Sequence, residues 1–226
     1  SIKFALDEKF ELSIIAIIFA AIFDTLDGRV ARMLKGTSLV GKELDSLADL
    51  ISFGVAPAFI MYFWSLNNLG KFGWSLTMMF VVCVALRLAR FNVSSSSEPS
   101  WKDNYFEGVP SPAGGILVLM PLILSLSEIN LIKINYNIVV PTFFILISFL
   151  LISKVPTFAF KKISIPRRMT IFALFGVVLF FGLLLIYTFK VLVICGLIYI
   201  CLIPFGYFSY QKIYKQKILS GENHDN

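Results

Sequence analysis

Long apolar runs are the feature that most constrains how this chain can fold. Of its 226 residues, 58% are hydrophobic and only 15% are charged, whereas about a quarter of the residues of a soluble domain are charged. Several runs approach the roughly 20 apolar residues that a helix needs to cross a bilayer. The sequence therefore predicts an integral membrane protein.

The spanning segments are predicted to be helices. The bilayer core contains no water, so a spanning chain must satisfy its backbone hydrogen bonds within a helix or a closed barrel. The alternating ten-residue pattern of a barrel is absent. We therefore predict an all-α, polytopic bundle over residues 1–209, followed by a tail at 210–226 that is first basic and then polar. About seven spans are expected, at 11–29, 46–66, 73–90, 112–128, 138–153, 169–188 and 191–209.

The basic residues predict the orientation of the bundle. If the first segment runs from outside to inside, fifteen Lys and Arg residues fall on the inner side and five on the outer side, as the positive-inside rule requires. We therefore expect a multi-pass protein of the cell (inner) membrane, with its basic face in the cytoplasm. The net charge of +6 follows from this topology and needs no nucleic-acid partner.

This topology places the first residue outside, although no signal peptide precedes it. We therefore expect the intact protein to have one more spanning helix before this segment, which gives eight in all. The only histidine, His224, lies in the polar tail, and the three cysteines fall within predicted spans. Catalytic triads and zinc sites built on histidine are thereby excluded within this chain.

Four aspartates interrupt the apolar pattern near residues 24–49. Asp24 and Asp27 are three residues apart, and Asp45 and Asp49 are four apart. Residues three or four apart share one face of a helix, so each pair forms one acidic face. On the first helix, that face continues through three further residues: Gly28, Ala31 and Arg32.

A short turn separates the two acidic faces. The stretch KGTS at residues 35–38 offers Gly36 for the end of one helix, and Thr37 or Ser38 as the N-cap of the next. Gly41 then lies one turn before Asp45, on the same face. Because the turn is short, we expect the two acidic faces to meet at the inner end of the helices.

Four converging carboxylates cannot all ionise without compensating positive charge. Two divalent cations would provide it, and carboxylate oxygens are the ligands that Mg²⁺, Mn²⁺ and Ca²⁺ prefer. Two metal ions held close together are a recurrent device for displacement at phosphorus. Gly28 and Gly41 leave space for a ligand, and Arg32 can contact phosphate oxygens.

Two other interpretations of the aspartates remain open at this point. In the first, the acids form salt bridges with Arg29, Arg32 and Lys42. They can also line the pathway of a divalent-cation transporter, as acids inside membranes often do. Transporter sites usually lie near the bilayer midplane, whereas these acids lie at helix ends beside basic residues, which argues against transport.

The pattern Asp24-x2-Asp27-Gly28-x2-Ala31-Arg32-x8-Gly41-x3-Asp45-x3-Asp49 resembles the complete signature of the CDP-alcohol phosphatidyltransferases. Four further blocks resemble the bacterial and archaeal phosphatidylserine synthases within that family. They are DSLADLISFGVAPAF, RLARFN at 87–92, FEGVPSPAGG at 106–115 and KVPTFAFKK at 154–162. Family members carry a spanning helix before the motif helix, and this segment departs from them in lacking it.

The resemblance implies the reaction and the roles of the motif residues. A phosphatidyl group would pass from CDP-diacylglycerol to an alcohol, with release of CMP. Asp24, Asp27, Asp45 and Asp49 would bind two divalent cations, Mg²⁺ or Mn²⁺, and Asp49 would also act as general base. Direct displacement is favoured because no Ser, Cys or His nucleophile is evident. The donor would be bound by Gly28, Ala31, Arg32, Ser38 and Gly41, with Thr37 as a secondary candidate.

L-Serine is the acceptor that the subfamily blocks imply. Arg87 and Arg90 lie three residues apart on one helical face and can bind its carboxylate, and Asn92 can add a hydrogen bond. Alternatively, these arginines anchor the helix at the inner membrane surface or bind lipid phosphate. Glycerol 3-phosphate and inositol phosphate remain the rival acceptors, and the family suggests a homodimer.

Overall fold

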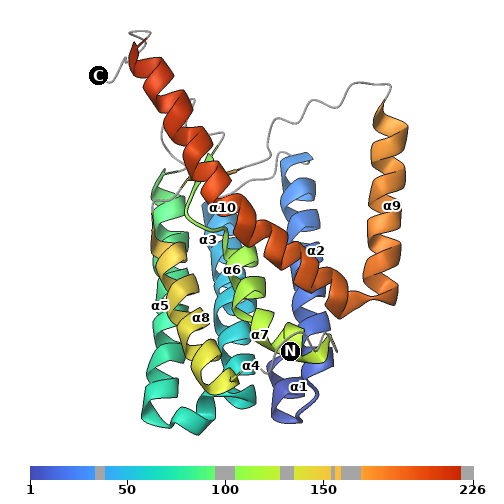
Figure 1. Cartoon of the computed structure of the whole chain (residues 1–226), viewed down its shortest axis with the longest axis vertical. Helices are drawn as coiled ribbons and strands as arrows, with labels where there is room; N and C mark the ends of the chain where they lie inside the picture. Colours follow the sequence, from blue (N-terminus) through green and yellow to red (C-terminus); the bar gives the residue numbers. More distant parts are fainter. Residues whose placement is uncertain (34–38, 95–104, 128–134, 154–155, 159–168, 220–226) are drawn as a thin grey trace. The chain divides into compact units, whose positions relative to one another are not determined.

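The computed structural model describes residues 1–33, 39–94, 105–127, 135–153, 156–158 and 169–219. Within these residues the chain is helical apart from turns and two three-residue strands (Figure 1). The all-α prediction is therefore confirmed. The chain forms two compact units: the first comprises residues 1–97 and 110–152, and the second comprises residues 98–109 and 153–226.

The first unit carries most of the helices. Two of its α-helices are preceded by short turns of other helical types. These are the π-helical turn η1 (Leu50–Val55) and the 3₁₀ turn η2 (Leu66–Leu69). The α-helices are α1 (Ile2–Leu6), α2 (Phe10–Met33), α3 (Leu39–Asp49), α4 (Ala56–Trp64), α5 (Lys71–Ser94), α6 (Ser111–Val118), α7 (Met120–Leu126) and α8 (Tyr136–Ile152).

The described residues of the second unit form two helices and a small strand pair. The helices are α9 (Thr170–Ile186) and α10 (Thr188–Leu219). Strands β1 (Tyr105–Glu107) and β2 (Pro156–Phe158) pair in antiparallel register, and α10 packs against β2. Because α10 is helical through residue 219, the predicted tail at 210–226 begins within a helix; residues 220–226 lie outside the described part.

Within the part of the chain that the structure describes, three helical segments are long and apolar enough to cross a membrane: Val40–Trp64, Lys71–Val93 and Thr188–Tyr207. Two shorter apolar helices are Tyr136–Ile152 and Leu174–Ile186. These five segments coincide with the predicted spans at 46–66, 73–90, 191–209, 138–153 and 169–188. The apolar helices mark a membrane protein, while the total of about seven spans stays a prediction.

The predicted span at 112–128 differs from the structure, which divides it. Helix α6 ends at Val118, and α7 begins two residues later at Met120. Pro121 follows this junction and has no amide hydrogen for the carbonyl one turn before it, so a regular α-helix cannot continue there.

The π-helical turn lies in the middle of the long helix that carries Asp45 and Asp49. It begins directly after Asp49, and the amide of Ala56 closes it with a hydrogen bond to the carbonyl of Ile51. Pro57 follows at once and cannot donate a backbone hydrogen bond. This wider turn therefore links α3 and α4 without ending the helix, immediately beside the last aspartate of the motif.

Helix α6 lies directly on the π-helical turn. A Cβ atom added at Gly115 would be 2.8 Å from the carbonyl oxygen of Phe53 and 3.0 Å from its Cα, which is closer than real Cβ atoms come to backbone. Only glycine therefore permits this close approach. Gly115 thereby allows α6 to pack closely against the helix that carries Asp45 and Asp49.

The core of the first unit fixes α5, the helix of the three predicted acceptor-binding residues. Helix α5 packs against α8, and the rings of Phe80 and Phe144 meet there with centroids 5.5 Å apart. Phe80, Val84, Phe144 and Ile147 have no exposed surface. A closely packed interface of this kind holds α5 rigidly.

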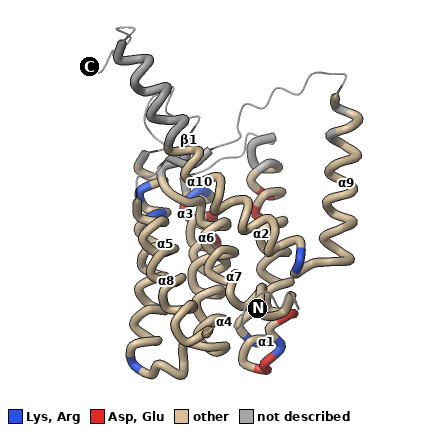
Figure 2. The backbone as a smooth tube through the Cα atoms, viewed as in Figure 1, with Lys and Arg blue, Asp and Glu red and all other residues tan. Residues whose placement is uncertain are grey.

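The region of the four aspartates and a group of aromatic rings lie at opposite ends of the first unit. In Figure 2, the acidic residues near the end of α2 and those of α3 lie toward the same end as the basic residues near the end of α5. At the start of α5, Trp74 packs edge-to-face on Phe59 and Tyr62, and Trp64 packs on Tyr136. Aromatic residues gather in this way at membrane–water interfaces.

Candidate active site

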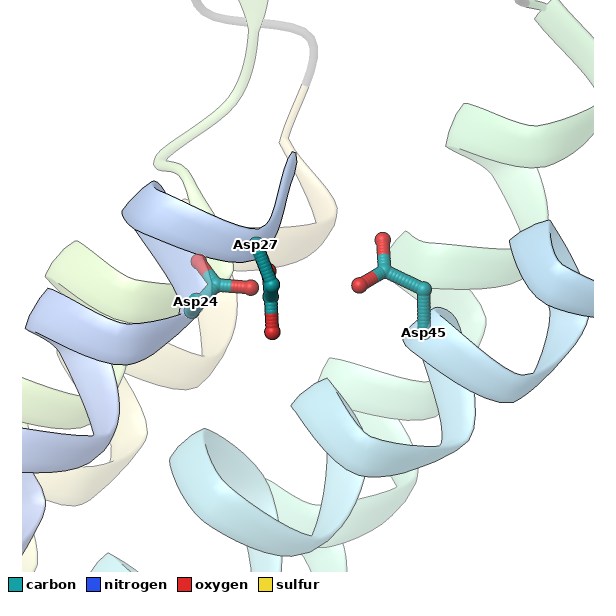
Figure 3. A group of neighbouring side chains, drawn as sticks. All are labelled: Asp24, Asp27 and Asp45. Atoms are coloured by element: carbon teal, nitrogen blue, oxygen red, sulfur yellow. The ribbon is translucent and has the colours of Figure 1, made fainter. Parts of the chain in front are cut away.

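The structure brings the four predicted aspartates together. Oxygen atoms of Asp24 and Asp27 on α2 and of Asp45 on α3 all lie within 4.8 Å of one another. Figure 3 shows the carboxylate of Asp45 facing the other two from the opposite helix. Asp49, one turn further along α3, shares a side-chain hydrogen bond with Asp24. We call these four residues the acidic cluster.

The acidic cluster has the donor set of a divalent-cation site. Its donors are carboxylate oxygens, which suit hard cations such as Mg²⁺, Mn²⁺ and Ca²⁺. Carboxylates this close repel one another unless a proton or a cation lies between them. The residues present therefore fit a metal ion, and they reach it from two separate helices.

Burial differs between the members of the cluster. Asp24 and Asp49 are half-buried, whereas Asp27 and Asp45 are exposed. The cluster is thus closed on one side by the helices and open on the other. A substrate can approach the carboxylates from the open side.

Gly28 borders the open side of the acidic cluster. A Cβ atom built there would meet no heavy atom within 4 Å, so free space lies directly beside Asp27. Gly41, one turn before Asp45, is also exposed. The structure therefore leaves room for a ligand at Gly28.

The remaining predicted donor-binding residues are less fully described. Ala31 and Arg32 belong to the last turns of α2, but their side chains lie outside the described part. Thr37 and Ser38 fall outside the described residues, as does Gly36, which was expected to end the first helix. The donor-binding set stays a prediction.

Exposed apolar side chains run along both helices that carry the acids. On each helix they recur at intervals of four, three and four residues, so they form a stripe on one face. The stripes are Phe19, Phe23, Leu26 and Val30 on α2, and Val40, Leu44, Leu47 and Ile51 on the helix of α3 and η1. The acidic cluster thus lies beside apolar surface that suits lipid.

Arg87 on α5 lies near the acidic cluster. Its Nη1 atom donates a hydrogen bond of 2.7 Å to the hydroxyl of Ser111 on α6. The positive charge of Arg87 also acts on Asp49. Arg87 is therefore placed where an anionic substrate group would meet both a cation and the acids.

Arg90 takes a different direction from Arg87. Its Nη1 atom donates a hydrogen bond of 2.7 Å to the carbonyl oxygen of Ile152, the last residue of α8. Arginine often binds the free carbonyls at the end of a helix in this way. Arg87 and Arg90 were predicted from their spacing to share one face of α5, and they bind different neighbours, Ser111 on α6 and Ile152 on α8.

Asn92 connects α5 to α3. Its Nδ2 atom donates to Ser46 Oγ at 3.0 Å and to the carboxylate of Glu43 at 3.3 Å. The ammonium group of Lys42 donates to the backbone carbonyl of Asn92 at 3.4 Å. These contacts hold the end of α5 beside the helix that carries Asp45 and Asp49.

Sequence reasoning missed Ser111, Ser46 and Glu43 as parts of the site's surroundings. Ser111 lies in the block FEGVPSPAGG, in which the sequence alone indicates no role for the serine. Its burial and its contact with Arg87 depend on how α6 meets α5. Spacing along one helix carries no such information.

Known proteins resemble the chain along most of its length. A family model described as CDP-alcohol phosphatidyltransferase matches residues 1–155, and one described as CDP-alcohol phosphatidyltransferase 2 matches residues 168–204. The Mycobacterium leprae (strain TN) protein named CDP-diacylglycerol--serine O-phosphatidyltransferase is 36% identical over 213 residues, which is 91% of this chain and 69% of the relative.

Two further relatives carry the same name. The Helicobacter pylori (strain ATCC 700392 / 26695) protein is 36% identical over 174 residues, covering 77% of this chain and 72% of its own. The Saccharomyces cerevisiae (strain ATCC 204508 / S288c) protein is 48% identical over 107 residues, covering 46% of this chain and 38% of its own. The acidic cluster and these similarities agree: the chain belongs to the CDP-alcohol phosphatidyltransferase family.

Proposed function

We propose that this protein is an enzyme that transfers the phosphatidyl group of CDP-diacylglycerol to L-serine, giving phosphatidylserine and CMP. Its family and the shared name of its relatives support this reaction. The observation that carries the proposal is the acidic cluster, in which two apolar helices place carboxylates within 4.8 Å of one another.

The surroundings of the cluster suit a lipid donor with a charged head group. Exposed apolar stripes flank the acids on α2 and α3, and they can contact acyl chains while the head group reaches the carboxylates. We propose that Gly28, Gly41, Ala31, Arg32, Thr37 and Ser38 bind this donor. The free space at Gly28 supports its place in that set.

Asp24, Asp27, Asp45 and Asp49 would hold two divalent cations, Mg²⁺ or Mn²⁺. When bound, such ions supply positive charge that stabilises the pyrophosphate and the departing CMP. This proposal rests on the oxygen donors of the cluster and on their arrangement on two facing helices.

Asp49 is the residue proposed to take the proton from the serine hydroxyl. The serine oxygen then forms a bond to the β-phosphorus, and the bond from that phosphorus to the CMP oxygen breaks. Asp49 suits this role because it is half-buried at the end of α3 and lies beside Asp24. We favour direct displacement; a labelled phosphatidyl adduct on the protein, formed without serine, would contradict it.

Arg87 is proposed to bind the serine carboxylate. Its guanidinium group offers the planar, paired donors that match a carboxylate, and its charge acts on Asp49. Arg90 and Asn92 lie on the same helix and have partners on α8 and α3. Their assignment to the acceptor stays a prediction.

We further propose that the enzyme is a multi-pass protein of the cell (inner) membrane, that its acidic cluster faces the cytoplasm, and that it is a homodimer. The distribution of Lys and Arg along the sequence supports the orientation. The dimer is suggested by the family resemblance.

The acceptor is tested by measuring CMP release from CDP-diacylglycerol. The purified chain is given Mg²⁺ or Mn²⁺ together with serine, glycerol 3-phosphate or inositol phosphate in turn. We expect release that requires both a divalent cation and serine. Release with another alcohol alone would keep the chemistry and replace the acceptor, whereas cation flux across sealed vesicles without CMP release would indicate a transporter.

A further inference from the structure

Ser111 is a buried hydroxyl that the proposed reaction does not use. It is the first residue of α6, and its exposed fraction is 0%. We propose that Ser111 is a positioning residue that holds the guanidinium group of Arg87 where it can bind the carboxylate of the acceptor serine. This inference rests on the proposed function, because it gives Arg87 the acceptor.

The contact between the two residues is short and part-buried. Arg87 Nη1 donates to Ser111 Oγ at 2.7 Å. A hydrogen bond that involves a charged group is shorter and about twice as strong as one between neutral groups. Because Ser111 is fully buried, water does not easily replace its hydroxyl as the partner of Arg87.

The position of Ser111 is fixed by the packing of α6. Gly115, one turn after Ser111, lies against the backbone of Phe53 in η1, where an added Cβ would be 2.8 Å from the carbonyl oxygen. The turn η1 follows directly on Asp49. Helix α6 therefore contacts the helix of Asp49 with one residue and Arg87 with another.

This arrangement makes α6 a spacer between Arg87 and Asp49. If α6 shifted, both the π-helical turn and the partner of Arg87 would shift with it. The packing of α6 thus sets the distance between the guanidinium group and Asp49. The contact with Ser111 also restricts the conformations that the long side chain of Arg87 can adopt.

Arg90 shows what an arginine on the same helix does with a different partner. It lies three residues from Arg87, and its guanidinium group binds the carbonyl of Ile152 on α8. The partner offered by the neighbouring helix therefore decides where each guanidinium group points. For Arg87 that partner is Ser111.

The chemical consequence concerns the binding of the acceptor. A free arginine side chain loses rotamer freedom when it binds a carboxylate, whereas a side chain already held in place loses less. Removing the hydroxyl of Ser111 should therefore weaken binding of serine. It should leave the donor and the metal requirement unchanged, because the proposed residues for both lie on α2 and α3 and in the segment that joins them.

The test compares Ser111→Ala with Ser148→Ala. Ser148 lies on α8 of the same unit and is 3% exposed, so the control removes a buried hydroxyl of equal size. We expect Ser111→Ala to raise the KM for serine about tenfold. The KM for CDP-diacylglycerol and the half-activating Mn²⁺ concentration should stay within about twofold. Ser148→Ala should leave all three unchanged.

Two further variants separate positioning from general loosening of the fold. Ser111→Cys keeps the buried volume but offers only a weak acceptor, and it should raise the KM for serine as the alanine does. In an Arg87→Lys background, Ser111→Ala should add less than about twofold, because the two changes act through one interaction.

Several results would overturn the inference. One is a KM for serine that Ser111→Ala changes by less than about twofold. Another is an equal rise in both KM values together with a lower unfolding temperature. A third is full additivity with Arg87→Lys. If the unaltered enzyme releases no CMP in response to serine, the proposed function fails, and this inference fails with it.

Discussion

The two ends of the first unit are held together by different interactions. At the end with the acidic cluster, the contacts between helices include hydrogen bonds: Arg87 to Ser111, Arg90 to the carbonyl of Ile152, and Asn92 to Ser46. At the other end they are ring contacts around Trp74. Arg87 lies thirteen positions after Trp74 on α5, which is about 20 Å along a helix.

The two kinds of contact suit two tasks in the same helical bundle, the positioning of charged groups and the anchoring of helix ends. Hydrogen bonds depend on direction, so they fix the positions of charged groups that must meet a substrate. Aromatic side chains bury large surfaces and tolerate the membrane–water interface, so they anchor the helix ends. Changes at the acidic end should therefore alter kinetics, and changes at the aromatic end should alter stability.

The largest expected effect is that of Asp49→Asn at the acidic end. The amide cannot accept the proton of the acceptor hydroxyl, so kcat should fall about 100- to 10,000-fold, while the protein still folds and binds CDP-diacylglycerol. CMP release and donor binding measure the two properties. Asp7→Asn, an exposed aspartate after α1, is the control and should keep full activity. Retained turnover in Asp49→Asn would remove the residue from its role as base.

A smaller effect is expected from Asp45→Asn. Loss of one negative ligand weakens a divalent-cation site, so the Mn²⁺ concentration for half-maximal activity should rise by about tenfold or more. The matched control is Glu43→Gln, which changes an acid on the same helix that contacts Asn92. Titration of Mn²⁺ against CMP release compares the two variants. An equal shift in both would mean that overall negative charge, and no particular ligand, sets the metal requirement.

The smallest effect is expected at the aromatic end. Trp74→Leu removes two edge-to-face ring contacts, with centroid distances of 5.8 and 5.4 Å, each worth about 0.5–1.5 kcal/mol. The unfolding temperature in detergent should fall, while the KM for serine and the Mn²⁺ requirement remain unchanged. Phe72→Leu, in the same first turn of α5 and more exposed than Trp74, serves as control. A kinetic change in Trp74→Leu would show that the two ends are coupled.

Local periodicity was sufficient to predict the acidic cluster and most helices. The intervals between the four aspartates placed each pair on one helical face, and the structure brings these faces together. Five predicted spans coincide with apolar helices for the same reason: length and hydropathy are properties of a single segment. The family resemblance was confirmed by the match over residues 1–155.

Features that depend on contacts between distant segments could not be predicted. Arg87 and Arg90 share a face by their spacing, but α6 and α8 offer them different partners. The buried hydroxyl of Ser111 meets Arg87 only because α6 packs against α5. The division of the 112–128 span had a visible signal in Pro121, although apolar composition outweighed it.

The π-helical turn after Asp49 has a consequence for the phase of the helix. A π-helical turn accommodates one residue more than an α-helical turn of the same rise. The acids before the turn and the buried residues of α4 after it can therefore face different partners, although they belong to one continuous helix. Deleting a single residue from Leu50–Val55 would restore an ordinary helix and rotate Asp49 by about 100° relative to α4. One extra residue in the π-helical turn thus sets the direction in which Asp49 points relative to the buried side chains of α4.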